Sequence, residues 1–163
     1  VLDVPRLYAE QELRLSYVIW QEGVTPFMVV ELLSPGTEKE DLGQTLRLVD
    51  APPTKWQVYE QILRVPYYVI FSRYTHECQA YVLNGTRYRK ADMPDKRLWL
   101  PEARLGVGLW EGAYQGITHP WLRFYREDGQ WIPTQAEARM QEKQRADKLA
   151  AKLRELGIDP ENF

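Results

Sequence analysis

Two apolar stretches near the start of the chain are separated by a polar break. Residues 15–20 and 27–33 are rich in aromatic and β-branched side chains, and residues 21–26 between them contain Gly and Pro. This pattern predicts two strands joined by a turn. The second stretch is apolar except for Glu31, which is typical of a strand covered on both faces in an α/β sheet.

Helical spacing replaces this pattern in the middle of the chain. Apolar residues at helical intervals predict a helix over residues 38–49, which Pro52 and Pro53 interrupt. Thr54 is a suitable N-cap for a second helix over residues 55–63. Apolar runs then predict two buried strands, at residues 67–71 and 79–83.

Turns and tryptophans characterise the segment that follows. Asn84-Gly85 predicts a hairpin turn before Tyr88. Residues 98–133 carry four tryptophans together with several Gly and Pro residues, so we expect short strands and turns packed on the main sheet. Core packing is the preferred role for these aromatic rings, and stacking on bases is the alternative.

The end of the chain predicts one long, charged helix. Thr134 and Glu137 have the spacing of a capping box, and the helical pattern continues to Leu156. We therefore divide the chain into a domain at 1–133 and a helical extension at 134–163. A narrow apolar stripe on this helix would suit a homodimer or packing across the domain, and a solvated tail is the alternative. The stripe consists of Met140, Ala146, Leu149, Ala150, Leu153 and Leu156.

Composition restricts the class of protein. The chain has 163 residues, and 21 basic against 23 acidic residues give a net charge of −2, which argues against a generally cationic nucleic-acid coat. Cys78 is the only cysteine, so we expect no internal disulfide and no cysteine-based zinc site. No apolar run is long enough to span a bilayer, and the chain does not start with a basic-then-apolar leader, so we expect a cytoplasmic protein without membrane contact.

One local excess of positive charge lies between Asn84 and Arg104. Its six basic residues outnumber three acidic ones, and such a patch could follow phosphates, although a solvated surface is the preferred interpretation. His76 and His119 lie in predicted turns without ligand spacing, so we assign them no role. The basic residues are Arg87, Arg89, Lys90, Lys96, Arg97 and Arg104.

Glu31 is the most informative candidate. A carboxylate within a doubly covered strand is costly to bury unless it is paired or binds a cation. It could be a metal ligand at the carboxyl end of a central strand, where open α/β sheets collect ligands. Alternatively, it lies at an exposed strand end or pairs with an arginine. Lys55 is a weaker candidate: it begins a helix, where its charge opposes the dipole, and a solvated lysine is the alternative.

The arrangement of these residues resembles a known family. Val29-Val30-Glu31-Leu32-Leu33-Ser34-Pro35 is followed by Asp41-Leu42, then Lys55, Tyr59 and the strand at 67–70. This order is similar to the Uma-type restriction endonuclease family, within the PD-(D/E)XK nuclease superfamily. Later segments extend the likeness over nearly the whole chain: 106–112, 121–125 and 149–161.

The resemblance implies a fold, a cofactor and site residues. The expected fold is α/β, a restriction-endonuclease-like mixed sheet with flanking helices. Glu31 would be the acidic metal ligand, the backbone carbonyl of Leu32 a second ligand, and Lys55 the catalytic lysine. The bound ion would be Mg²⁺ or Mn²⁺, because hard divalent cations prefer oxygen ligands and activate water.

The chain departs from the family pattern in several places. Leu33 occupies the usual lysine position after the glutamate, so Lys55 would have to supply the charge from the helix. The expected Pro-Asp motif is not seen, so we expect its Asp to lie before Val1, and Asp3 is the substitute within the chain. Ser72 stands where many members have Asp.

The resulting hypothesis is a metal-dependent endonuclease that hydrolyses phosphodiester bonds, with DNA preferred over RNA as substrate. The alternative is a catalytically inactive nuclease-fold module for nucleic-acid binding or oligomeric interaction. A third interpretation, a structural protein that binds a partner through its tryptophan-rich half, leaves a buried Glu31 without explanation.

Overall fold

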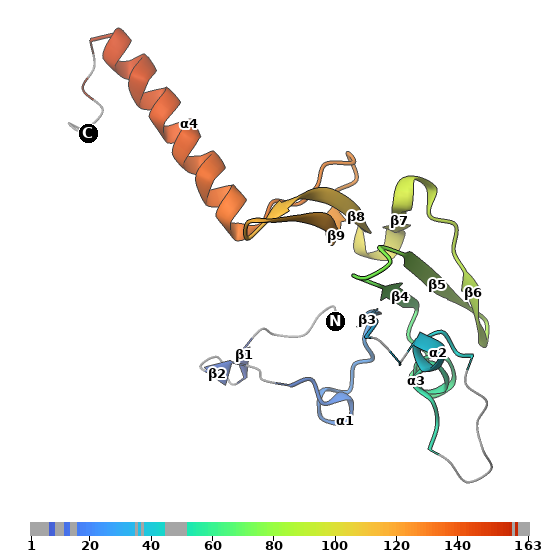
Figure 1. Ribbon diagram of the computed structural model, residues 1–163. Helices are drawn as coiled ribbons and strands as arrows, with labels where there is room; N and C mark the ends of the chain where they lie inside the picture. Colours follow the sequence, from blue (N-terminus) through green and yellow to red (C-terminus); the bar gives the residue numbers. More distant parts are fainter. Residues whose placement is uncertain are drawn as a thin grey trace.

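The computed structural model describes residues 7–8, 12–13, 16–34, 36, 38–44, 52–157 and 159 (Figure 1). Within these residues the protein is mixed α/β, with one four-stranded and one three-stranded sheet and a short antiparallel pair, β1 (Leu7–Tyr8) with β2 (Glu12–Leu13). The expected fold class, a mixed sheet with flanking helices, is therefore confirmed.

The four-stranded sheet has the order β3-β4-β5-β6 and combines both strand directions. β3 (Met28–Leu32) pairs in parallel with β4 (Tyr67–Phe71), so the two strands end at the same edge of the sheet. β5 (Cys78–Asn84) and β6 (Arg87–Lys90) continue it antiparallel, joined by a tight hairpin. All four strands lie where the apolar runs and the Asn-Gly turn predict them.

Short helices precede and follow β3. α1 (Ile19–Glu22) occupies part of the segment that we expected to be a strand, so that prediction is wrong. The reason is physical: β-propensity reflects packing on a pleated neighbour, the described residues offer this segment none, and Trp20 is 86% exposed. α2 (Glu38–Asp41) is the described part of the helix expected over 38–49; residues 45–50 of that helix lie outside the described residues.

The helix after Thr54 is confirmed, with an irregularity. α3 (Lys55–Gln57) begins at a capping box in which Thr54 accepts from the Gln57 amide. It continues as a π-helical turn, Val58–Ile62, in which the Leu63 amide donates to the Val58 carbonyl. Turns of this kind are rare and occur frequently at functional sites.

The tryptophan-rich segment forms the second sheet. β7 (Arg97–Leu100), β8 (Leu105–Tyr114) and β9 (Ile117–Tyr125) are antiparallel, with short 3₁₀ turns at Pro94–Lys96 and Pro101–Ala103. β8 and β9 are longer than the short strands that we expected. The segment packs on the main sheet as predicted, since Leu98 and Val107 belong to the same buried cluster as Val69.

The described residues therefore form three layers, with the main sheet in the middle. One face of that sheet packs against β7–β9, and the other packs against α2, α3 and the π-helical turn. The cluster on the helical side is aromatic, and Tyr68 at its centre is fully buried. Its other main members are Ile70, Tyr88, Trp56, Tyr59 and Tyr81.

β3 is less covered than its sequence predicts. It is at the edge of the sheet, and Val30 and Leu32, on the face toward β7–β9, are 36% and 65% exposed. The prediction of a strand covered on both faces is wrong here, because the second sheet reaches Met28 but does not extend over Val30 and Leu32.

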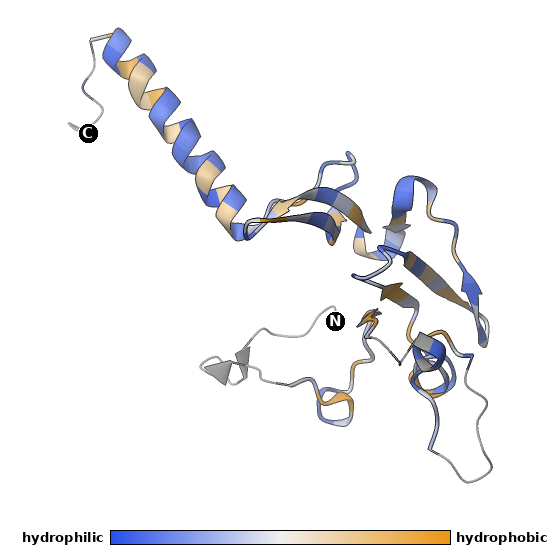
Figure 2. Cartoon of the chain, viewed as in Figure 1, coloured by the Kyte–Doolittle hydropathy of each residue, from blue (hydrophilic) through white to orange (hydrophobic). Residues whose placement is uncertain are grey.

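α4 (Gln135–Glu155) extends away from the sheets and is mostly hydrophilic (Figures 1 and 2). Its capping box at Thr134 and Glu137 is present as predicted. Arg123 from β9 forms an ion pair with Glu137 and so fixes the first turn of the helix to the second sheet. No helix among the described residues combines the length and apolarity needed to cross a bilayer.

Candidate functional site

Glu31 lies near the carboxyl end of β3, on the helical side of the sheet. Its neighbours on that face, Val29 and Leu33, pack in the aromatic cluster, and the Glu31 side chain is 18% exposed. The Tyr59 hydroxyl donates a hydrogen bond to Glu31 Oε1 at 2.9 Å. Among the described residues the partners of Glu31 are a lysine and a tyrosine and not the arginine of the alternative interpretation, and the side chain is mostly covered rather than at an exposed strand end.

Lys55 reaches the same place from the first turn of α3. Its Nζ lies 2.9 Å from Asp41 Oδ1 and 3.3 Å from Glu31 Oε2. The hydrogen bond with Asp41 raises the pKa of Lys55 above its usual value; burial opposes this effect, and Glu31 adds to it. Lys55 is therefore a paired residue, and the alternative of a merely solvated lysine is wrong.

Asp41, the last residue of α2, is the third member and the one that sequence reasoning missed. Its side chain is 1% exposed, and the Tyr68 hydroxyl donates to its backbone carbonyl at 3.1 Å. The available signal was its place in the family-like motif, to which we attached no role. Glu31, Asp41 and Lys55 are hereafter called the carboxylate-lysine cluster.

The π-helical turn and the aromatic cluster position these groups. Lys55 and Tyr59 are one helical turn apart, so both reach Glu31 from one face of the helix. Burial, together with the bond to Glu31, raises the pKa of Tyr59 to about 12. Burial likewise raises the pKa of Tyr68. Both hydroxyls are thus protonated donors at neutral pH.

The backbone of Leu32 faces the open edge of the sheet. Because the Leu33 amide donates to the Phe71 carbonyl at 2.9 Å, Leu33 directs its polar backbone groups toward β4. Successive residues of a strand alternate in this respect, so the Leu32 carbonyl points away from β4. No described strand pairs with β3 on that side.

The oxygen donors suit a hard divalent cation in kind. Two carboxylates from separate elements converge on one positive charge, the Lys55 ammonium, and Mg²⁺ and Mn²⁺ prefer such oxygen ligands. Among the described residues, no group of three His, Cys, Asp or Glu side chains could hold a metal. Asp3 lies outside the described residues. Ser72, at the position where many members have Asp, accepts a hydrogen bond from the Thr75 amide.

A second acid-cation pair lies on the same helical segment. Glu60 is 3% exposed and accepts from the Tyr88 amide at 2.8 Å and from Arg87 Nη1 at 3.0 Å. Burial alone would raise the pKa of Glu60, but the bonds from Tyr88, Gln61 and Arg87 outweigh it and lower the pKa. This pair joins the π-helical turn to β6.

Several residues of the basic patch expected between Asn84 and Arg104 also form internal contacts. Arg87 pairs with Glu60, and Arg104 pairs with Glu127 at 2.7 Å. Arg97 lies over the Trp131 ring at 4.3 Å. Half of the six basic residues therefore have structural partners, which favours the interpretation as ordinary surface.

The two histidines, to which we assigned no role, lie together. His119 Nδ1 and His76 Nε2 are 3.0 Å apart, although 43 positions separate them in sequence. The pair connects the loop after β4 to β9. No spacing rule could reveal this contact, because it depends on how the second sheet packs on the first.

Comparison with known proteins places the chain in a family. The model of the Uma2 family, described as "Putative restriction endonuclease", matches residues 4–118. No curated protein and no solved structure matches the chain. The matched region contains the carboxylate-lysine cluster and more than half of the 163 residues. The chain therefore belongs to the Uma2 restriction endonuclease family.

Proposed function

We propose that this protein is a metal-dependent endonuclease that hydrolyses phosphodiester bonds of DNA. The observation that carries the proposal is the carboxylate-lysine cluster, in which Glu31 and Asp41 share one ammonium. Membership of the family implies a nucleic-acid substrate and, in general, a divalent metal. The DNA preference and the identity of the ion, Mg²⁺ or Mn²⁺, belong to the proposal.

Glu31, Asp41 and the Leu32 carbonyl would hold the ion. When bound, a divalent cation lowers the pKa of coordinated water and polarises the phosphate. Tyr59 orients Glu31 by its hydrogen bond, and Tyr68 fixes the backbone of Asp41. Two residues of the aromatic cluster therefore contact both of the carboxylate-bearing residues.

Lys55 acts as a fixed positive charge. Because its pKa is raised, the side chain stays protonated over the neutral range and is unsuited to accept a proton from water. Its ammonium group can instead donate to a phosphate oxygen and offset the charge that accumulates there during attack. The proton of the attacking water would therefore pass to bulk solvent rather than to Lys55.

The test is cleavage of supercoiled plasmid and single-stranded DNA by the full chain with Mg²⁺ or Mn²⁺, compared with Glu31→Gln and Asp41→Asn. The matched control is Glu60→Gln, which neutralises a buried carboxylate outside the cluster. We expect cleavage to fall at least about 100-fold in both cluster variants, the size of effect typical of lost electrostatic stabilisation, and to persist in Glu60→Gln.

An absence of cleavage by the folded parent chain would contradict the proposal. Equal rates in Glu31→Gln and the parent would do the same. Nucleic-acid binding without cleavage would favour the alternative, a nuclease-fold module that has no turnover.

A homodimer through α4 is a separate part of the proposal. Met140, Leu149 and Leu156 in its apolar stripe are each at least 60% exposed. Pairing two such helices would remove this surface from water. Sedimentation of the parent and of Leu149→Lys tests it: we expect a dimer that the charge dissociates, and a monomeric parent would contradict it.

A further inference from the structure

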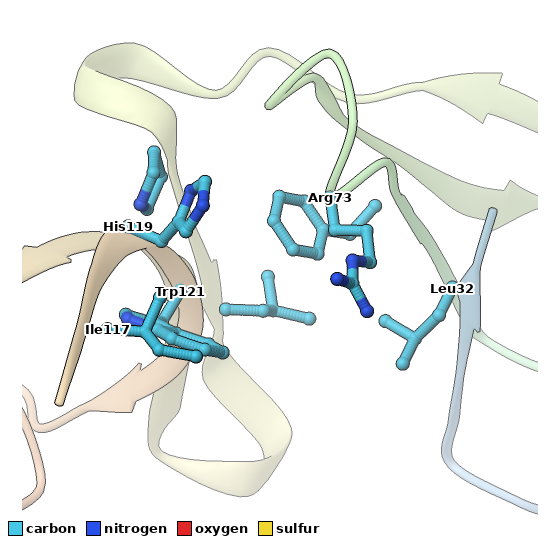
Figure 3. Close-up of a pocket in the computed structure, with 8 residues that line it drawn as sticks. Leu32, Arg73, Ile117, His119 and Trp121 are labelled. Carbon is cyan, nitrogen blue, oxygen red and sulfur yellow. The ribbon is translucent and has the colours of Figure 1, made fainter. Parts of the chain in front are cut away.

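A pocket of about 550 Å³ lies between the end of β3 and the second sheet; Figure 3 shows the residues that line it. It is on the face of the main sheet opposite the carboxylate-lysine cluster. Its volume lies in the range of small-ligand sites. Leu32 and Arg73 stand on one side of it, and Ile117, His119 and Trp121 stand on the other (Figure 3). Its apolar walls are formed by Leu32, Phe71, Ile117, Pro120, Trp121 and Leu122.

The pocket is adjacent to the candidate active site through the backbone of β3. Leu32 directly follows Glu31, and successive side chains of a strand point to opposite faces. Leu32 and Phe71 are paired in register at the ends of β3 and β4. A flexible chain crossing the end of β3 could therefore contact both Glu31 and the pocket.

Its apolar surface is unusually open to water. Leu32 is 65% exposed and Ile117 is 53% exposed, although both face the same cavity. The Trp121 ring is held in place, since its Nε1 donates to the Gly112 carbonyl at 3.1 Å and Tyr114 packs edge-on against it at 5.4 Å. The pocket thus offers a fixed aromatic wall before any ligand arrives.

Arg73 gives the pocket a positive charge. Within the described part of the chain, its guanidinium carbon lies 5.5 Å from the centre of the Tyr74 ring, and no ion pair to Arg73 is found. A guanidinium beside an apolar, aromatic cavity is suited to a ligand that combines a flat apolar body with an anionic group. A nucleotide has this combination, as a base joined to a phosphate.

The histidine pair holds the two walls together. His119 lines the pocket, and its contact with His76 bridges to the loop that carries Arg73. His76 has a positive φ of 57°, a conformation that non-glycine residues adopt at a cost. The two walls are therefore linked at the rim of the pocket.

We infer that this pocket binds one unpaired nucleotide of the nucleic-acid strand, next to the phosphodiester at the carboxylate-lysine cluster. Trp121 and Leu32 take the base, and Arg73 pairs with a phosphate. The inference rests on the proposed function for its substrate class and adds a strand preference. A base inside a duplex cannot enter such a pocket without leaving the stack, so single strands bind better than duplexes.

The test measures binding of fluorescent 12-nucleotide oligomers by anisotropy in EDTA, with single-stranded DNA, single-stranded RNA and duplex DNA as separate probes. The variants are Arg73→Gln and Leu32→Glu, both at exposed positions, with Arg126→Gln as the control for an exposed arginine outside the pocket. We expect the first two to weaken single-strand binding about tenfold, as loss of a stacked base or a phosphate contact does. Arg126→Gln should not change it.

A series of abasic oligomers refines the test. Removing the base that enters the pocket should weaken binding by the parent chain and have no further effect in Trp121→Ala. Trp121→Phe, which keeps an aromatic face, should restore most of the affinity. Arg73→Gln should also reduce the slope of log affinity against log salt by about one phosphate contact.

These outcomes separate the pocket from catalysis, because binding in EDTA does not depend on cleavage. If cleavage is observed and both Arg73→Gln and Leu32→Glu bind single strands as the parent chain does, the pocket inference is overturned and the proposed function is left intact. Pocket-dependent binding without cleavage would support the inference and contradict the catalytic proposal. Binding to neither single strand, or equal binding to the duplex, would overturn the inference.

Discussion

The carboxylate-lysine cluster and the Glu60-Arg87 pair are two acid-cation arrangements on one helical segment. Both contain a nearly buried carboxylate, Asp41 in the first and Glu60 in the second. Both also pair that carboxylate with a cation that is partly exposed, Lys55 or Arg87. By burial and distance alone the two would be difficult to distinguish.

The two arrangements differ in the number of carboxylates that they bring together. Glu60 matches one formal negative charge with one arginine and adds a backbone amide at 2.8 Å, so its oxygens are well supplied with donors. In the cluster, two carboxylates from separate elements, Glu31 and Asp41, contact the ammonium group of Lys55. The comparison teaches that the convergence of carboxylates from separate elements, rather than burial, distinguishes a candidate metal site from a structural pair.

Removing the cation from each arrangement should give the largest difference in cleavage rate between the two. We expect Lys55→Met to lower the rate of metal-dependent cleavage at least about 100-fold, because a charge that stabilises the transition state is lost. Arg87→Met, the matched control, should leave the rate within about threefold, since losing a charge distant from the chemistry changes no transition-state contact. Single-turnover cleavage assays measure both. Equal losses of cleavage rate in the two variants would mean that the difference between the two arrangements has no role in function.

Neutralising one carboxylate in each arrangement should distinguish a role in folding stability from a role in metal binding. In metal-free buffer, Glu60→Gln should lower the free energy of unfolding by about 2–3 kcal/mol, because the bonds to Arg87 and Tyr88 lose a charged acceptor. Glu31→Gln should cost less than about 1 kcal/mol, since it also relieves repulsion with Asp41. Urea unfolding measures the difference.

Added Mg²⁺ sharpens the same experiment. Binding to the folded state raises the melting temperature, so the parent and Glu60→Gln should both gain stability and Glu31→Gln should not. A metal-dependent gain in Glu31→Gln equal to that of the parent would show that Glu31 is not a ligand.

The smallest expected effect concerns Tyr59. Tyr59→Phe should cost about 1 kcal/mol at neutral pH, the usual contribution of one hydrogen bond. Because the pKa of Tyr59 is raised from 10 to about 12, the unfolded chain loses this proton first as pH rises. The stability of the parent should therefore fall between pH 10 and 12, and the variant should lack this part of the decline. Unfolding at pH 8 and pH 11, with Tyr74→Phe as the control, tests it; identical slopes would contradict it.

Local signals predicted much of the fold. The apolar runs of β3, β4 and β5, the N-cap at Thr54 and the capping box at Thr134 are found where expected, because caps and continuous apolar runs depend on neighbouring residues in the sequence. The strand expected at 15–20 failed for the opposite reason, since Ile19 and Trp20 lie in a short helix and no strand among the described residues lies beside them.

The site was predicted only in part. The cost of burying Glu31 in an apolar strand marks it as a residue that needs a partner, and the structure provides Lys55 and Tyr59. Asp41 could not be placed by the same argument, because its burial depends on how α2 packs over the sheet. The pocket lined by Leu32 and Trp121 requires two sheets to meet, and no periodicity along the chain encodes that meeting.

The π-helical turn at Val58–Ile62 has an evolutionary consequence. The turn adds one residue to the helical repeat between Lys55 and Leu63. Lys55 points to Glu31, and Glu60, which lies within the turn, points to β6. Deleting one residue between Lys55 and Glu60 would rotate Glu60 by about 100° about the helix axis relative to Lys55. Lys55 and Glu60 could then no longer meet their partners together. Lineages of this protein should accordingly accept substitutions in this segment more readily than any change in its length.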